Sequence, residues 1–223
     1  MTQQDQIPRG IAIHEAGHAV SRWYTGTYFD LVVVRSPREQ QEGPFIDDSG
    51  KSYDGGGFVL ASRRYRSRYL LSGKTVRAID MKPNSVIDPS DKNEILRPAR
   101  ERVQCEIEIM HDFAGPIAHA KYAHKSMIYM MFHGGYYDYM NACSLVDDYC
   151  RIKEERKSMM DRLEKQTRNI FRKPGVWNAV EALATALQEK RYIEWEEAVD
   201  IISMHTGEKD RPFDVVWPEH LKG

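Results

Sequence analysis

The sequence has no long hydrophobic run and almost no net charge. Its 223 residues include 32 basic and 33 acidic side chains, which gives a formal net charge of −1. No apolar stretch approaches the roughly 20 residues that a membrane-spanning helix needs. A balanced charge provides no global attraction to nucleic acid or to an anionic membrane. We therefore expect a globular protein with no membrane span and no nucleic-acid partner.

Cysteine is scarce, and features of an exported protein are missing. Three cysteines occur, Cys105, Cys143 and Cys150, an odd number without a C-x-x-C pair. The first residues, Met-Thr-Gln-Gln-Asp-Gln, lack the basic and apolar regions of a signal peptide. We expect free thiols and a cytoplasmic location.

The most informative stretch that is present contains a His-Glu-x-x-His pattern in a run typical of a helix. Residues four apart lie on one face of a helix, so His14 and His18 can direct two imidazole nitrogens to one metal ion. Glu15 lies about 100° around the helix from His14, beside the metal, where it can take a proton from an activated water. A Gly inside a helix costs roughly 0.5–1 kcal/mol relative to Ala, so Gly17 indicates close packing by another segment. Two His leave Zn²⁺ short of its usual three protein ligands and water.

The rest of the sequence predicts a mainly α protein with a small β-sheet or hairpin, an α+β fold. We expect a first helix over residues 7–25, capped by Asp5, and strands over Phe29–Arg35 and Phe58–Ala61. Gly and Pro predict an exposed loop over 36–51 and an irregular connection over 76–93. The expected later helices are Arg97–His124 with a break or kink at Gly115-Pro116, Asp138–Phe171, 176–188 and 194–203. A further boundary is expected at His133-Gly134-Gly135.

The residues alone leave the third metal ligand open. Asp138 follows the Gly-Gly boundary at a helix start, where a carboxylate is held rigidly, although such positions also favour a plain helix cap. Glu108 and Asp112 form a Glu-x-x-x-Asp pair, the layout of another zinc-peptidase group with the Glu as ligand. His111 and His133 are further candidates.

Several segments together resemble a known family. His14–Val20 resembles the zinc helix of FtsH-type ATP-dependent zinc proteases. Leu31–Val34 and Gly57–Leu60 are similar to the strand pair that follows that helix. Asp112–Ala118 resembles a helix of the family, with Pro116 and Ile117 replacing Arg and Ala. Gly134–Asp138 resembles the segment that holds the third zinc ligand, and Val180–Trp195 the terminal helical pair.

The resemblance implies a single zincin-like helical metallopeptidase domain over residues 1–223, with 36–56 and 76–96 as loop insertions. It implies zinc held by His14, His18 and Asp138, with Glu15 as general base. The family's ATPase module and membrane anchor are not found in this sequence, so a separate ATPase or adaptor stays open as a partner, as does a homo-oligomer.

The leading interpretation is a zinc metallopeptidase that hydrolyses peptide bonds in peptides or unfolded protein segments. We hypothesise that an extended peptide pairs with the strand containing Gly57, Phe58, Val59 and Leu60. The alternative is a catalytically inactive zinc-binding regulatory or interaction protein of the same fold, which would not need Glu15. A third reading uses the basic and aromatic stretch Arg63–Lys74, including Arg64 and Arg66, for nucleic acid; the near-zero net charge favours an ordinary solvated surface.

Overall fold

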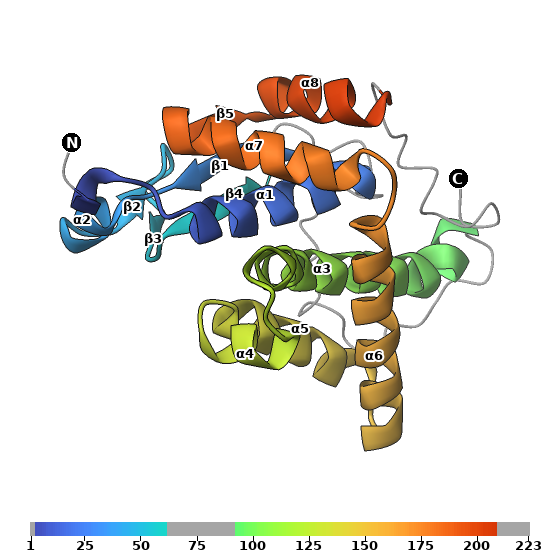
Figure 1. The fold of residues 1–223 in the computed structure, drawn as a ribbon. Coiled ribbons are helices and arrows are strands. Elements are labelled where there is room, and N and C mark those ends of the chain that lie inside the picture. The colour runs from blue at the N-terminus through green and yellow to red at the C-terminus, as the bar shows by residue number, and fades with distance from the viewer. Residues whose placement is uncertain (1–2, 62–91, 209–223) are drawn as a thin grey trace.

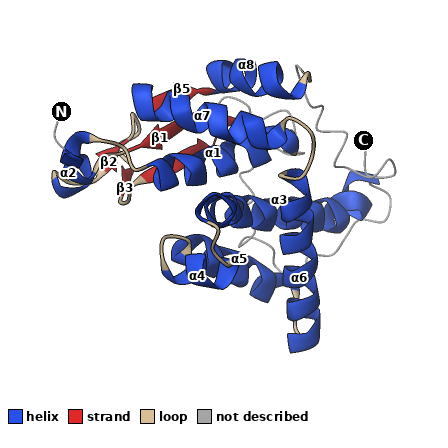
Figure 2. Ribbon diagram, in the orientation of Figure 1, coloured by secondary structure: helices blue, strands red, loops and turns tan. Residues whose placement is uncertain are grey.

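The computed structural model describes residues 3–61 and 92–208, which form a mainly helical protein with a small antiparallel sheet (Figure 2). The prediction of an α+β fold is confirmed at this level. The helices are α1 (Arg9–Tyr24), α2 (Pro37–Gln41), α3 (Lys92–Ala123), α4 (Met127–Phe132), α5 (Tyr136–Tyr149), α6 (Lys153–Ile170), α7 (Val176–Lys190) and α8 (Trp195–Thr206), after a short 3-10 turn at Gln3–Asp5. The strands are β1 (Phe29–Val34), β2 (Phe45–Ile46), β3 (Ser52–Tyr53), β4 (Gly57–Ala61) and β5 (Tyr192–Glu194).

The elements are stacked in layers around α1. From top to bottom in Figure 1 lie α7 and α8, then α1 with the sheet, then α3, and finally α4 and α5, while α6 runs across the lower layers. Helix α1 packs against α3, α7 and the strands β1 and β4. Its central turns are almost wholly buried, including Ala12, Ile13, Ala16 and Ala19. No helix in the ranges 3–61 and 92–208 combines the length and apolarity that crossing a bilayer requires.

Close contact between α1 and α3 depends on small residues. A Cβ atom added at Gly17 would lie 2.5 Å from the Cβ of Ala118 and 2.9 Å from the carbonyl oxygen of Ala114. Both distances are shorter than packed atoms allow. The prediction that Gly17 marks a close approach by another segment is therefore confirmed.

The larger sheet has the strand order β4-β1-β5, with both pairs antiparallel. Val32 lies opposite Val59 in β4 and opposite Ile193 in β5. Strand β4 therefore lies at one edge of the sheet formed by the described residues. Sequence patterns missed β5, because three residues between two helices are too few to show a period of two.

The segment predicted as an exposed loop over 36–51 contains more structure than expected. Ser36 caps α2 by accepting from the backbone N–H of Glu39, while the Glu39 side chain accepts from the backbone N–H of Ser36, a complete capping box. Farther on, β2 and β3 form a small hairpin. Phe45 and Tyr53 of this hairpin pack on Phe58 of β4, with ring centroids 5.1 Å apart in each case. The loop prediction is wrong in these parts, because capping and aromatic contacts supply order that Gly and Pro counts do not reveal.

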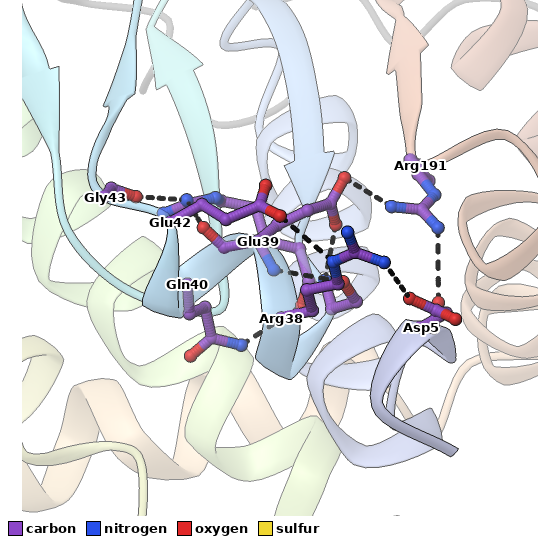
Figure 3. Close-up of polar contacts among 9 residues, drawn as sticks. Asp5, Arg38, Glu39, Gln40, Glu42, Gly43 and Arg191 are labelled. Atoms are coloured by element: carbon purple, nitrogen blue, oxygen red, sulfur yellow. Dashed lines mark hydrogen bonds and ion pairs between the residues drawn. The ribbon is translucent and has the colours of Figure 1, made fainter. Parts of the chain in front are cut away.

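A polar network fastens α2 to the end of α7 (Figure 3). Arg191 pairs with the carboxylate of Glu39 and donates 3.2 Å to the carbonyl oxygen of Asp5. Arg38 lies 3.5 Å from the Asp5 carboxylate and 3.0 Å from that of Glu42. Exposed ion pairs contribute little singly. Together these contacts hold the N-terminal turn, α2 and the start of β5 in one arrangement.

Four other sequence predictions need correction. Of the break or kink expected at Gly115-Pro116, the break is absent, since α3 is one helix from Lys92 to Ala123. Packing against α1 on both sides of Pro116 offsets the hydrogen bond that proline removes. The single helical region predicted over Asp138–Phe171 is divided into α5 and α6 at Cys150 to Ile152. Cys150 therefore follows α5 rather than sharing a helix face with Cys143, and the three cysteines are free.

The fourth correction concerns α1, whose N-cap residue is Pro8 without a side-chain cap, so Asp5 does not cap it. The predicted basic stretch Arg63–Lys74, the connection over 76–93 and most of the insertion over 76–96 lie outside the described residues.

Candidate metal centre

Helix α1 presents two imidazole rings to one point. The Nε2 atoms of His14 and His18 lie 3.0 Å apart, and the ring centroids are separated by 4.7 Å with an interplanar angle of 71°. Both side chains are largely buried, with 10% and 13% of their surface exposed. Two ring nitrogens that converge in this way, one helical turn apart, are suited to binding the same cation.

Asp138 brings a carboxylate to the same point from α5. Its Oδ2 lies 3.1 Å from Nε2 of His14, and its Oδ1 lies 3.6 Å from Nε2 of His18. One ligand atom from each of the three residues lies within 4.8 Å of the others. Asp138 occupies the first turn of α5, where the partial positive charge of the helix N-terminus stabilises a carboxylate. The structure thus brings together the three side chains that the family resemblance implies.

Gly115 of α3 makes room for this convergence. A Cβ atom at Gly115 would lie 2.2 Å from Nε2 of His18 and 2.6 Å from Nε2 of His14. Any larger residue would therefore occupy space between the two imidazoles and the helix behind them. The sequence suggested a break at Gly115, whereas the structure shows that the missing side chain leaves space beside both rings.

A hydrogen bond orients one of the rings. Nδ1 of His18 lies 2.7 Å from the carbonyl oxygen of His111, which can only accept, so Nδ1 carries the proton. The lone pair of the neutral ring is then on Nε2, facing His14 and Asp138. His111 itself is held by a 2.7 Å contact between its Nε2 and Oγ1 of Thr25. This arrangement matches the hydrogen bonding that orients metal-binding histidines in proteins.

The charges at the centre are strongly coupled. Burial disfavours ionisation of Asp138, but His18 and His14 outweigh it and hold the pKa of this carboxyl well below its usual range. Burial likewise favours the neutral ring of His18, yet Asp138, assisted by Glu15, raises the pKa of His18 to about 9. At neutral pH a proton and a metal ion therefore compete for the same position. Two nitrogens and one carboxylate oxygen are a donor set that suits Zn²⁺ with one coordination position left for water.

Glu15 lies beside this centre and is 5% exposed. Burial raises its pKa, while His14 and His18 act in the opposite direction. A carboxylate with a raised pKa is a better proton acceptor near neutral pH than an exposed one. A Cβ atom at Gly57 would lie 2.4 Å from Cγ of Glu15, so the start of β4 passes directly over this carboxylate.

The alternative ligand Glu108 is engaged elsewhere. Its carboxylate lies 3.3 Å from Nη2 of Arg22 and accepts from Gln104 at 3.0 Å. Burial opposes ionisation, but Arg22 and His111 lower the pKa of Glu108 to about 2. Glu108 is absent from the group of ligand atoms that the described residues form. In the described residues Glu108 thus pairs with Arg22 and Gln104, while the ligand atoms of His14, His18 and Asp138 converge without it.

The remaining sequence candidates are also outside that group. Burial raises the pKa of Asp112 to about 8, against an opposing effect of His18. The ring of His133 stacks on Tyr129, with centroids 4.0 Å apart. Sequence reasoning missed His119, whose ring centroid lies 6.2 Å from that of His14. The spacing of four residues from His111 through Gly115 to His119 could have placed it on the same face of α3.

Among residues 3–61 and 92–208, the hydrogen-bonding pattern leaves one side of β4 without a partner strand. The backbone N–H of Arg35 donates to the carbonyl oxygen of Gly56 at 2.7 Å. Antiparallel pairs alternate between bonded and non-bonded positions, so Phe58 and Leu60 bond to β1 while Gly57 and Val59 direct their N–H and C=O groups away from it. Among the described residues no strand pairs with this outer side of β4. An extended peptide could therefore pair with it next to Glu15.

Neither a scan against protein-family models nor a search of curated proteins finds a match to this sequence. What the chain does must therefore be inferred from the chemistry of the centre itself.

Proposed function

We propose that this protein is a zinc-dependent metalloendopeptidase with an FtsH-peptidase-like, zincin-like domain, acting on peptides or unfolded protein segments. The observation that carries the proposal is the convergence of His14, His18 and Asp138 with the buried carboxylate of Glu15 alongside. A site used only to hold a metal would not need that fourth, acidic group. The outer side of β4 beside Glu15, with which no strand of the described residues pairs, adds a place for an extended substrate.

Each residue of the site has a separate role in the proposed hydrolysis. Zinc, when bound, supplies Lewis-acid activation of water near neutral pH and positive charge for the transition state. Glu15 accepts the proton from the attacking water and passes it to the leaving amine. His14, His18 and Asp138 hold the ion, and the outward N–H and C=O groups of Gly57 and Val59 align the peptide backbone over Glu15.

Metal analysis tests the ligand set. Purified wild-type protein should contain about one zinc per chain. Asp138→Ala should lower zinc affinity by more than the roughly 10–100-fold that loss of an outer hydrogen-bonding partner causes. Glu108→Ala, which removes a neighbouring carboxylate paired with Arg22, is the matched control and should retain zinc. The measurement is zinc content after dialysis against a graded series of chelator concentrations.

Two results would contradict the ligand assignment: loss of zinc from Glu108→Ala, or full retention by Asp138→Ala. Wild-type protein that holds zinc but cleaves no member of a diverse peptide library would instead support the regulatory or interaction protein. Zinc content and cleavage are therefore measured on the same preparations.

Proline at Val59 tests the substrate strand. The N–H of Val59 points away from β1, so Val59→Pro removes a donor for the peptide without removing a bond of the sheet. We expect KM for peptides to rise about 2- to 10-fold, the effect of one hydrogen bond, while the hydrogen bonds between β4 and β1 are kept. Leu60→Pro is the matched control, because the N–H of Leu60 bonds to β1; it should lower the unfolding free energy by about 1–3 kcal/mol. An unchanged KM in Val59→Pro would show that substrates do not pair with β4.

A further inference from the structure

One face of the larger sheet packs on the core, and the other face borders a cavity. Strand residues alternate between the two faces of a sheet. Val32 and its neighbour Ile193 are wholly buried in the core, so Leu31 and Val33 point to the opposite face. Arg35 follows Val33 at the same spacing, just beyond the end of β1. On this second face a cavity of about 820 Å³ lies between β1, β5, α2 and the start of the β2–β3 hairpin.

Most of the wall of this cavity is apolar. The apolar side chains that line it are Leu31, Val33, Pro44, Phe45, Ile46 and Tyr192. Tyr192 of β5 lies directly opposite Val33 of β1, so the two strands form one continuous floor. Cavities of roughly 300–1,000 Å³ with apolar walls and a few polar groups are typical of sites for small molecules.

Arg35 brings a buried positive charge to the cavity. It is 8% exposed, and its guanidinium donates to the carbonyl oxygens of Glu39, Gly43 and Gly55, the last at 3.4 Å. Arg35 takes part in none of the ion pairs that the described residues form. Its three hydrogen bonds use three of the five N–H groups of a guanidinium. A buried cation without an acidic partner is costly, so an anion that enters the cavity would be stabilised there.

The other charged residues that line the cavity do not replace that anion. They are Glu39, Glu42, Lys190, Arg191 and Glu194. Glu39 pairs with Arg191, as Figure 3 shows, while Glu42 and Lys190 pair with charged groups outside the cavity. Glu194 is exposed to solvent, where water and salt screen its charge. Among the charged groups of the cavity, Arg35 is therefore the buried one that lacks an oppositely charged side chain.

We propose that this cavity binds a small carboxylate with an apolar body, of the size of a medium-chain fatty acid. The carboxylate accepts from the remaining N–H groups of Arg35, a geometry that a guanidinium favours. The apolar chain lies along Val33 and Tyr192. An inorganic anion would leave these apolar walls in water, and an uncharged apolar molecule would leave Arg35 without an anion. No residue of the candidate metal centre lines the cavity, so this inference does not depend on the proposed peptidase function.

The first test compares three probes on the wild-type protein by isothermal titration calorimetry at pH 7.5. Octanoate and octan-1-ol have the same chain length and differ in charge, while acetate has the carboxylate without the chain. Octanoate should bind at least about 10-fold more tightly than octan-1-ol, the effect of hydrogen bonds between charged groups. It should bind at least about 100-fold more tightly than acetate, because burial of each CH₂ group is favourable.

Two variants place the ligand in the cavity. Tyr192→Glu adds a negative charge to the floor at a residue that is 59% exposed, so the fold should be kept. It should weaken octanoate binding at least about 10-fold and leave octan-1-ol less affected. Met204→Glu adds the same charge on α8, at a residue that is 81% exposed and outside the cavity, and should leave octanoate binding unchanged. Arg35→Met keeps an apolar stem and should remove the preference for octanoate over octan-1-ol.

Equal affinity of the wild type for octanoate and octan-1-ol would overturn the proposal and leave Arg35 as a fastening for the backbone between Glu39 and Gly55. Unchanged octanoate binding in Tyr192→Glu would overturn it as well, because the ligand would then lie elsewhere. Circular dichroism checks that each variant folds. If Arg35→Met does not fold, the three probes on the wild type and the pair of Tyr192→Glu and Met204→Glu still decide the question.

Discussion

Replacing Glu15 by Gln is expected to reduce peptide hydrolysis by about 10²- to 10⁴-fold, the contribution typical of a general base. The amide has nearly the same shape as the carboxylate but cannot accept the proton of the attacking water. Glu15 does not belong to the group of ligand atoms formed by His14, His18 and Asp138. Zinc content should therefore stay at the wild-type level. The measurement is kcat on a fluorogenic peptide that the wild type cleaves.

Glu39→Gln is a useful control for this experiment. Glu39 is also a partly buried carboxylate in a hydrogen-bonded network, but it lies on α2. Its replacement should leave kcat unchanged. Glu15→Gln protein that retains zinc and hydrolyses peptides at the wild-type rate would remove Glu15 from the mechanism and with it the main argument for an enzyme.

The second large effect is expected from Gly115→Ala, the addition of one methyl group. Ala is the better helix former by about 1 kcal/mol, so propensity alone predicts a more stable α3. The new Cβ would instead lie 2.2 Å from Nε2 of His18 and 2.6 Å from Nε2 of His14. Both rings would have to move away from the position at which they meet Asp138. We expect zinc binding and hydrolysis to be lost together in a protein that still folds.

Gly10→Ala is the matched control for Gly115→Ala, because it makes the same change between the same two helices. Its Cβ would meet Nε2 of His119 at 2.5 Å, and that ring is not one of the three candidate ligands. Zinc should be retained in Gly10→Ala. Normal zinc content and activity in Gly115→Ala would show that the ion does not bind where His14 and His18 converge. The measurements are zinc content, circular dichroism and kcat.

The local parts of the site could be predicted from sequence because they depend on helix geometry. The spacing of His14 and His18 is sufficient to place both rings on one face of α1. Asp138 could be proposed because a Gly-Gly boundary and a helix start are local signals. The approach of Asp138 to the histidines depends on the tertiary fold, so the residues alone leave Glu108 open as an alternative ligand. In the structure Glu108 pairs with Arg22.

The errors arose where packing overrides local preference. Gly115-Pro116 predicts a break or kink, yet α3 is one helix from Lys92 to Ala123, with α1 packed along it. Gly115 looked like a conformational signal, although its role is to leave space for two rings on another helix. Strand β5 exists because β1 offers it a partner, and no pattern within its three residues indicates a strand.

The separation of the candidate ligands along the chain has a thermodynamic consequence. His18 belongs to the first long helix and Asp138 to α5, so a bound ion would cross-link the chain between positions 18 and 138. The three ligands converge only in the folded protein, so the ion binds that state and adds to its stability as the concentration of free ion rises. Bound metal would therefore hold α5 against α1 and slow the local unfolding of α5. The folded lifetime of the protein would then depend on the concentration of free ion.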